Sequence, residues 1–272
     1  MSVTIYSLGS GSTGNCLVIS AGASRVLIDA GFGPRSLTRR LKAAALRPAD
    51  IDAVLLTHVH SDHTGGAARW CEHHEVPLVH HERNTRALAR SLEGYTRLRD
   101  AGWVATFGPG PFELAGLVVE HIDVAHDAPG VTSGFRISGP NGRGTWRAAI
   151  ATDVGTADAP LAALASDCDV VVIESNHDPE MLKTSGRPAW LRKRISGPKG
   201  HLSNQDCAEL LEKALAMSSS EPQAVALAHL SLECNRPDLA LEAACEALSR
   251  AGARGTSVTT LAAHPLDRIS MS

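Results

Sequence analysis

The sequence predicts an α/β layered fold, and three observations support this prediction. Short apolar runs with strand character alternate with amphipathic helical segments along the chain. Several of these runs end at polar residues, which is how strands carry functional side chains to the edge of a sheet. With 272 residues, 43% of them hydrophobic, the chain can bury a sizeable core without disulfides. We expect one domain over residues 1–272, because no internal repeat, low-complexity segment or long linker divides it.

The composition limits the partners and the compartment. The net charge of -3 excludes a polyanion-binding protein that works by bulk electrostatics, so any contact with nucleic acid must come from a local basic patch. The six cysteines contain no C-x-x-C pair, which favours free thiols in a reducing cytoplasm. We find neither a signal-peptide core nor an apolar run of about 18 residues, so we expect a soluble cytoplasmic protein without a membrane partner.

The first half of the chain is expected to contain strands followed by helices. Strands are expected at residues 3–8, 16–20, 25–28 and 51–57. Helices are expected at residues 36–46, from Gly65-Gly66 to about residue 75, and at residues 82–99. Two histidine pairs, His73-His74 and His80-His81, are expected to be mostly solvated because neither has a carboxylate partner or follows an expected strand.

The second half of the chain is predicted to form a sheet, followed by strands that alternate with helices. Strand-like runs between residues 103 and 122 alternate with Gly/Pro turns, as in an antiparallel sheet. Further strands are expected at residues 134–138, 146–152, 169–173 and 224–228. Ser203 with Asp206 three residues later indicates the start of a helix. Pro237 opens a last helix, which Gly252 closes.

The segment Thr57–His63 carries the strongest chemical signal in the sequence. Directly after the apolar run at residues 53–56, four possible metal ligands fall within six positions: His58, His60, Asp62 and His63. Neutral imidazoles together with a carboxylate are the ligands that a zinc-like ion prefers. With 13 histidines in the chain a single H-x-H would be unremarkable, but the full H-x-H-x-D-H pattern after a strand predicts a metal site.

Other polar residues follow apolar runs in the same way and could complete this site. They are Asp29, Asp153, Glu174 and His229, and the loop at residues 123–130 carries His126. We expect two ions, the first held by His58, His60 and His126, and the second by Asp62, His63 and His229. Asp153 would bridge the two ions. A nitrogen-rich set with carboxylates and no thiolate suits Zn²⁺ best and permits Mn²⁺ or Fe.

The loop between residues 9 and 15 contains three glycines and four small polar residues. Ser10, Thr13 and Asn15 are candidates for binding substrate, because such a loop lets backbone and hydroxyl groups approach a ligand closely. A tight hairpin turn is the alternative. Asp29 lies beside this loop, where it either braces the metal site or is an ordinary turn aspartate.

The motif Thr57–His63, with the later His126, Asp153 and His229 in that order, resembles the signature of the metallo-β-lactamase fold hydrolases. The resemblance covers nearly the whole chain. It implies a four-layer αββα sandwich with a dinuclear metal site at one edge of the two sheets.

Within that superfamily the later motifs resemble two groups. Glu174, the run at 200–203 and the run at 227–231 are similar to phosphodiesterase members such as ribonuclease Z, in which a glutamate–histidine pair assists at the phosphate. The fuller runs at 8–16, 174–178 and 200–204 more closely resemble the small bacterial WalJ/YycJ-type exonucleases. The sequence contains no flexible arm of the kind found in the transfer-RNA processing enzymes, so we do not expect transfer RNA as the substrate.

These features lead to a hypothesis of metal-assisted phosphodiester hydrolysis. A hydroxide that bridges the metals would attack phosphorus. His201, oriented by Glu174, would donate a proton or hydrogen bond to the phosphoryl or leaving oxygen, and Asp62 would orient the water as well as bind metal. Asn176 and His177 either contact substrate or form a turn. For His201 and Glu174 the alternatives are a helix-entry residue and a buried structural acid.

The segment 183–199 contains six basic residues, no acidic residue and Trp190, so it is a candidate contact for nucleic acid. The expected substrate is a nucleic acid or a small phosphodiester. An alternative is a thioester or lactone hydrolase of the glyoxalase II kind with the same metal site, which would not need Glu174 and His201. A non-enzymatic metal-binding module is a further alternative. A homodimer is possible.

Overall fold

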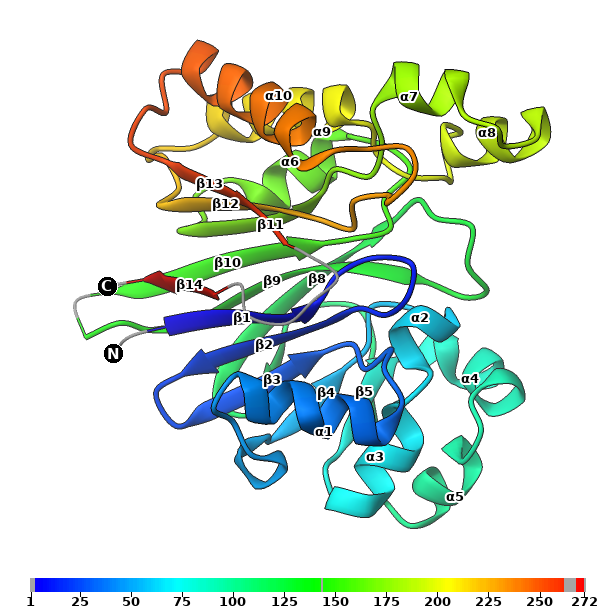
Figure 1. Cartoon of the computed structure of the whole chain (residues 1–272). Coiled ribbons are helices and arrows are strands. Elements are labelled where there is room, and N and C mark those ends of the chain that lie inside the picture. Colours follow the sequence, from blue (N-terminus) through cyan, green and yellow to red (C-terminus); the bar gives the residue numbers. More distant parts are fainter. Residues whose placement is uncertain (1–2, 143, 262–267, 272) are drawn as a thin grey trace. The chain divides into compact units, whose positions relative to one another are not determined.

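A computed structural model describes residues 3–142, 144–261 and 268–271. The chain forms two compact units, drawn with their elements in Figure 1. The first unit comprises residues 1–119, 128–133 and 262–272, and the second comprises residues 120–127 and 134–261. Each unit is described by itself below. The single domain expected over residues 1–272 stays a prediction.

The first unit is built on a mixed sheet whose strands follow the order β14-β1-β2-β3-β4-β5-β6. These strands are β14 (Arg268–Met271), β1 (Val3–Gly9), β2 (Cys16–Ala21), β3 (Ser24–Ile28), β4 (Ala53–Leu55), β5 (Leu78–His81) and β6 (Val104–Phe107). The pairs from β14 to β3 are antiparallel, and those from β3 to β6 are parallel. The carboxyl ends of β3, β4 and β5 therefore lie at one edge of this sheet.

Helices of the first unit pack on this sheet through their apolar faces. They are α1 (Pro34–Ala43), α2 (Ser61–Thr64), α3 (Ala67–His74), α4 (Thr85–Ser91) and α5 (Tyr95–Asp100), with the short η1 (Pro48–Asp50) and η2 (Glu82–Asn84) between them. Leu37 and Leu41 lie one turn apart on α1 and share a core cluster with Trp70 of α3. Val18 and Leu27 contribute to this cluster from the sheet.

The second sheet has the strand order β13-β12-β11-β10-β9-β8-β7. Its strands are β7 (Phe112–Leu114), β8 (Leu117–Val124), β9 (Thr132–Pro140), β10 (Thr145–Ala151), β11 (Val170–Glu174), β12 (Ala224–Ala228) and β13 (Ser257–Thr260). β10, β11, β12 and β13 are parallel to one another, whereas β9 is antiparallel to β10 and β7 to β8. The ends of β10, β11 and β12 thus lie side by side.

Five helices belong to the described part of the second unit. They are α6 (Ala159–Ala165), α7 (Pro179–Thr184), α8 (Ala189–Ile195), α9 (Asn204–Ala216) and α10 (Pro237–Arg250). α6, α9 and α10 share a core cluster with β11 and β12, to which Leu210 and Ala244 contribute. α7 and α8 lie to one side of these three helices (Figure 1). The predicted start of α9 is confirmed, because Ser203 and Asp206 form a reciprocal capping box.

The structure corrects two predictions for the first half of the chain. The single helix expected at residues 82–99 is interrupted, because Gly94 adopts a φ of 89° between α4 and α5. The prediction that His80 and His81 are solvated is wrong, since both lie in β5 and are buried. β5 was not predicted because its four residues are too few to show an alternating pattern. His73 is exposed, as expected.

Two predictions from composition can be compared with the structure. All six cysteines are free, as the sequence predicts, and five are buried, where a free cysteine packs as a small hydrophobic residue. Among the described residues, no helix is both long enough and apolar enough to cross a membrane.

Candidate functional site

In the first unit, Asp29 joins the ends of two neighbouring parallel strands. It follows β3, and its carboxylate accepts hydrogen bonds from the Thr57 backbone N–H (2.8 Å), the Thr57 hydroxyl (2.8 Å) and Nδ1 of His63 (2.7 Å). Asp29 is buried and has a φ of 63°, a left-handed conformation that aspartate tolerates better than most residues. The carboxylate therefore fixes the start and the end of the Thr57–His63 motif, which agrees with the predicted bracing role.

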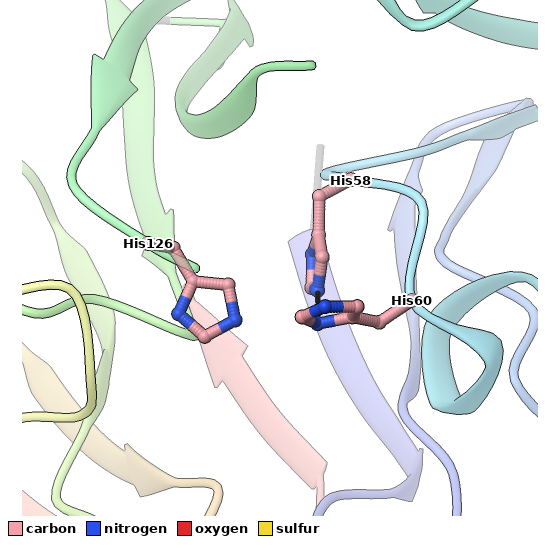
Figure 2. Close-up of side chains that lie close together, drawn as sticks. All are labelled: His58, His60 and His126. Atoms are coloured by element: carbon pink, nitrogen blue, oxygen red, sulfur yellow. Dashed lines mark hydrogen bonds between the residues drawn. The ribbon is translucent and has the colours of Figure 1, made fainter. Parts of the chain in front are cut away.

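The hydrogen bonds of Thr57 determine which nitrogen of His58 carries the proton. Because the Thr57 hydroxyl donates to Asp29, it accepts from Nδ1 of His58 at 3.0 Å. Nε2 of His58 then carries a lone pair, and Nδ1 of His60 lies 3.1 Å from it. Figure 2 shows this hydrogen bond between the two rings, which stand on the loop after β4, and also shows His126, which belongs to the second unit.

A hydrogen bond from Nδ1 also orients His63 and fixes which of its nitrogens carries the proton. Its Nδ1 donates to Asp29, so its Nε2 carries the lone pair, which accepts from the side-chain amide of Asn15 at 2.9 Å. The same amide lies 3.4 Å from Oδ2 of Asp62. A β-carbon at Gly31 would lie 1.7 Å from the carbonyl oxygen of Asp62, so only glycine permits this close approach. The first unit thus presents histidine nitrogens and a carboxylate in the form that binds a divalent cation.

In the second unit, three polar residues stand at the ends of three adjacent parallel strands. Asp153 follows β10, Glu174 ends β11, and His229 follows β12. All three are buried, and Asp153 and His229 have φ values of 59° and 56°. Left-handed backbone in residues other than glycine is uncommon and gathers at functional sites. The prediction that these strand ends bring polar side chains together is borne out within this unit.

Glu174 connects the three segments that carry these residues. Its Oε1 lies 2.7 Å from Nδ1 of His229 and 2.9 Å from Nδ1 of His201, while its Oε2 accepts from the backbone N–H groups of Val154 (2.8 Å) and Leu202 (3.1 Å). Burial raises the pKa of Glu174, but the charges and hydrogen bonds of the two histidines outweigh burial and lower the pKa to about 2. Glu174 is therefore a fully hydrogen-bonded carboxylate that orients both rings.

Asp153 lies among three histidines of the same unit. Its Oδ1 is 3.6 Å from Nε2 of His126, 3.6 Å from Nδ1 of His229 and 3.7 Å from Nδ1 of His201. Burial lowers the pKa of His126 in spite of Asp153, which favours the neutral ring that a metal requires. Burial also opposes protonation of His229, but Asp153 and Glu174 outweigh it and raise the pKa of His229.

Within this group His201 differs from its neighbours in exposure. Its side chain is 22% exposed, whereas those of Asp153, Glu174 and His229 are 3%, 0% and 4% exposed. Nδ1 of His201 is engaged by Glu174, which leaves Nε2 as the ring atom that can reach a substrate. The group of Asp153, Glu174, His201 and His229 offers ligand atoms close enough together to hold a metal ion.

Two of the residues predicted to bind substrate, Asn15 and Asn176, have structural roles. Asn15 closes its own loop by accepting from the Gly11 N–H and also braces His63, while Ser10 is buried and Thr13 is exposed. The side-chain amide of Asn176 donates to the carbonyl of His229 at 2.8 Å, and His177 is buried with a pKa lowered by burial. Substrate binding by these five residues stays a prediction.

A buried amide network behind Glu174 was not predicted. The Asn204 amide donates to Oδ1 of Asn235, the Asn235 amide donates to the Ser175 carbonyl, and the Ser175 hydroxyl donates to Oδ1 of Asn204. These bonds connect the segment after β11 to the start of α9 and to the loop before α10. The runs at 174–178 and 200–204 contain Ser175 and Asn204, and this was the signal in the sequence that could have drawn attention to the network.

The donor sets of both units fit metal ions. Histidines supply nitrogen, Asp62 and Asp153 supply carboxylate oxygen, and Asp29 and Glu174 orient ring nitrogens by accepting from the opposite nitrogen, as carboxylates behind metal-bound histidines do. Burial raises the pKa of the Cys16, Cys71, Cys168 and Cys207 thiols, and no buried cysteine lies in this donor set. This chemistry favours zinc or another borderline ion.

Comparison with known proteins gives consistent results. A family model described as the metallo-beta-lactamase superfamily matches residues 9–146. Exodeoxyribonuclease YycJ of Bacillus anthracis is 30% identical over 90% of this chain and 89% of its own length. Exodeoxyribonuclease WalJ of Streptococcus pneumoniae is 32% identical over 86% of this chain and 83% of its own length.

Solved structures agree on the fold. The metallo-beta-lactamase fold protein YhfI from Bacillus subtilis matches with a TM-score of 0.71 and 13% identity, and the match covers 100% of both chains. With two mixed sheets that each carry helices, this likeness confirms the predicted αββα fold class.

Proposed function

Since the chain belongs to the metallo-β-lactamase superfamily of metal-dependent hydrolases, we propose that it is a phosphodiesterase that degrades DNA from a strand end. The observation that carries this proposal is the sharing of one Glu174 oxygen by His201 and His229. One ring of this pair is buried and suited to bind metal. The other is partly exposed and suited to act on a phosphate.

We propose that seven residues bind two divalent metal ions. They are His58, His60, Asp62, His63, His126, Asp153 and His229. Support comes from the lone pairs on Nε2 of His58 and His63 and from the position of Asp153 among three histidines. Zn²⁺ suits this donor set best. When bound, the ions would supply a water of lowered pKa and would neutralise charge on the phosphate.

The side chains of the protein would perform the remaining tasks. His201, with Nδ1 held by Glu174, would donate from Nε2 to the phosphoryl or leaving oxygen. Glu174 stays ionised and so favours the protonated ring that this donation needs. Asp62 would orient the attacking water. A leaving 3′ or 5′ oxygen carries developing negative charge, which a protonated histidine stabilises.

The expectation of DNA as substrate rests on two relatives that are named exodeoxyribonucleases and that match over most of their length. A nuclease that acts on cellular DNA also fits the proposed cytoplasmic location, which the six free cysteines support. The thioester or lactone hydrolase remains the alternative, and a homodimer stays a prediction.

The test is a nuclease assay with the metal-loaded protein. Single- and double-stranded DNA and RNA, labelled at either end, would be digested and separated by size. We expect DNA to shorten progressively from one end. Cleavage within the strand would contradict an exonuclease. Complete inertness towards these strands and towards bis-p-nitrophenyl phosphate would contradict a phosphodiesterase.

A further inference from the structure

Helix α8 of the second unit carries an aromatic side chain that the fold does not use. None of its side chains is buried, and Trp190 is 67% exposed. Trp70 and Trp146, by contrast, are buried in the cores. Leu191 and Ile195 of the same helix are partly buried, so Trp190 is the large apolar side chain that α8 leaves in water, which is typical of a surface that binds a partner.

Two lysines of the same basic segment as Trp190 have no counter-charge among the residues that the structure describes. Within the described residues, Lys193 and Lys199 are exposed and form no ion pair, whereas Arg187 pairs with Glu233 and Arg194 pairs with Asp127. Lys193 follows Trp190 by three positions, so both side chains lie on one face of α8. This face therefore combines an aromatic ring with uncompensated positive charge.

The end of α8 is anchored to the candidate site of the same unit. The Asp127 N–H donates to the Lys199 carbonyl (2.9 Å), and Nε of Arg194 donates to the Asp127 carboxylate (2.8 Å). Nδ1 of His126 donates to the Gly200 carbonyl at 3.2 Å.

The residue before His201 shows how close this packing is. A β-carbon at Gly200 would lie 2.0 Å from the carbonyl oxygen of Ile195, and the His201 N–H donates to that same oxygen at 2.8 Å. Trp190 lies five residues before Ile195, which is about 7 Å along the helix axis. The carboxyl end of α8 and the segment after it thus lie beside His126 and His201, while Trp190 lies near the opposite end of the helix.

We propose that the α8 surface, defined as Trp190, Lys193 and Lys199, binds the unpaired nucleotides of a single DNA strand next to the reacting phosphodiester. Trp190 stacks on a base, and the two lysines bind phosphates. Stacking requires an exposed base face, which a paired duplex offers only at its terminal base pair, whereas every unpaired nucleotide can offer one, so the partner is single-stranded. This inference rests on the proposed phosphodiesterase function.

The experiment measures binding of a fluorescent phosphorothioate single strand, which resists hydrolysis, to the full-length protein at several salt concentrations. We expect Trp190→Ala to weaken binding about 5- to 100-fold, because one stacked base is lost. Trp190→Phe, which keeps an aromatic face, should retain most of the affinity. The strand should quench tryptophan fluorescence in the unchanged protein and much less in Trp190→Phe.

The lysines are tested through the salt dependence. Replacing both Lys193 and Lys199 by Ala should reduce the slope of log affinity against log salt by about 1.4, which is about 0.7 for each lost phosphate contact on a single strand. The matched control replaces Arg39 and Lys42, two exposed basic residues of α1 in the first unit, by Ala. This control should leave the slope unchanged.

Two results would overturn the inference: an unchanged affinity in Trp190→Ala, or equally tight binding of a blunt duplex. Failure of the proposed function is seen separately. If the metal-loaded unchanged protein does not hydrolyse bis-p-nitrophenyl phosphate, the proposed phosphodiesterase function is wrong. If it does, and Trp190→Ala still binds the strand fully, only the role of the α8 surface is wrong.

Discussion

Nδ1 of His63 lies 2.7 Å from Oδ2 of Asp29, and both side chains are buried. The same carboxylate accepts two hydrogen bonds from Thr57, at the other end of the motif. One residue from β3 therefore sets the ring orientation of His63 and, through the Thr57 hydroxyl, that of His58. The H-x-H-x-D-H pattern depends on a carboxylate 28 residues before Thr57.

Asp29→Asn should lower the affinity for Zn²⁺ about 10- to 100-fold. Three donors surround the carboxylate, and an amide places its own N–H₂ group against at least one of them, so the orientation of His58 or His63 is lost. Competition with a chromogenic chelator measures the affinity. Asp52→Asn is the matched control, because Asp52 accepts the backbone N–H of Arg25 in β3 and lies in an exposed position. Equal zinc affinity of Asp29→Asn and the unchanged protein would refute the bracing role.

His201→Ala should lower kcat on bis-p-nitrophenyl phosphate about 10²-fold or more, because the leaving oxygen loses its proton donor. The zinc content, measured in the same samples, should stay at the level of the unchanged protein. His73→Ala, which changes an exposed histidine of α3, is the control and should have full activity. A thioester or lactone hydrolase would keep its activity in His201→Ala, so a full rate on such a substrate would favour that alternative.

Glu174→Gln should change how the stability of the metal-free protein depends on pH. The pKa of Glu174 is lowered from 4.5 to about 2, so its contribution is fully present above pH 4.5 and is lost as the pH falls towards 2. The pKa of His229 is raised above 6.5, so its contribution is present below pH 6.5 and is lost as the pH rises through the raised value.

We therefore expect Glu174→Gln to be less stable at neutral pH, to lose less stability between pH 4.5 and 2, and to lose less above pH 6.5. Urea unfolding across this range, with a chelator present, measures both changes. Glu209→Gln on α9 removes an exposed carboxylate as the control. Parallel stability profiles for Glu174→Gln and the unchanged protein would show that the two histidines do not depend on this carboxylate.

Features that depend on neighbouring residues in the sequence were predictable. The ligand pattern of Thr57–His63, the strand ends at Asp153 and His229, and the capping box at Ser203 each follow from a few consecutive residues. Most predicted helices and strands agree for the same reason, apart from their ends, although β5 was missed and the helix expected at residues 82–99 is interrupted. The predicted strand at residues 51–57, for example, is the shorter β4.

Features that depend on tertiary contacts were predictable only where a motif resemblance supplied them, as for the orientation of His201 by Glu174. The sharing of Glu174 by His201 and His229 joins residues 27 and 55 positions apart, and the Asn204–Asn235 bond spans 31 positions. A pattern in a few consecutive residues does not predict hydrogen bonds between positions so far apart in the sequence. The burial of His80 has the same origin, because it follows from the pairing of β5 between β4 and β6.

That buried histidine has a definite partner. Nδ1 of His80 lies 2.9 Å from the His81 carbonyl, which can only accept, so Nδ1 carries the proton and Nε2 accepts from the Tyr95 hydroxyl at 2.8 Å. Burial lowers the pKa of His80, which keeps the ring neutral. The two residues connect β5 to α5 inside the core of the first unit.

Tyr95→Phe should lower the free energy of unfolding by about 1–3 kcal/mol, because it leaves a buried ring nitrogen without its donor. Urea unfolding at neutral pH measures the change. The second tyrosine of the chain gives the control: Tyr6→Phe, at a half-buried position on β1, should cost less than about 0.5 kcal/mol. If both variants lose the same small amount, the hydrogen bond between Tyr95 and His80 does not stabilise the fold. A larger loss in Tyr95→Phe alone would assign that stability to the buried pair, independently of any metal ion or substrate.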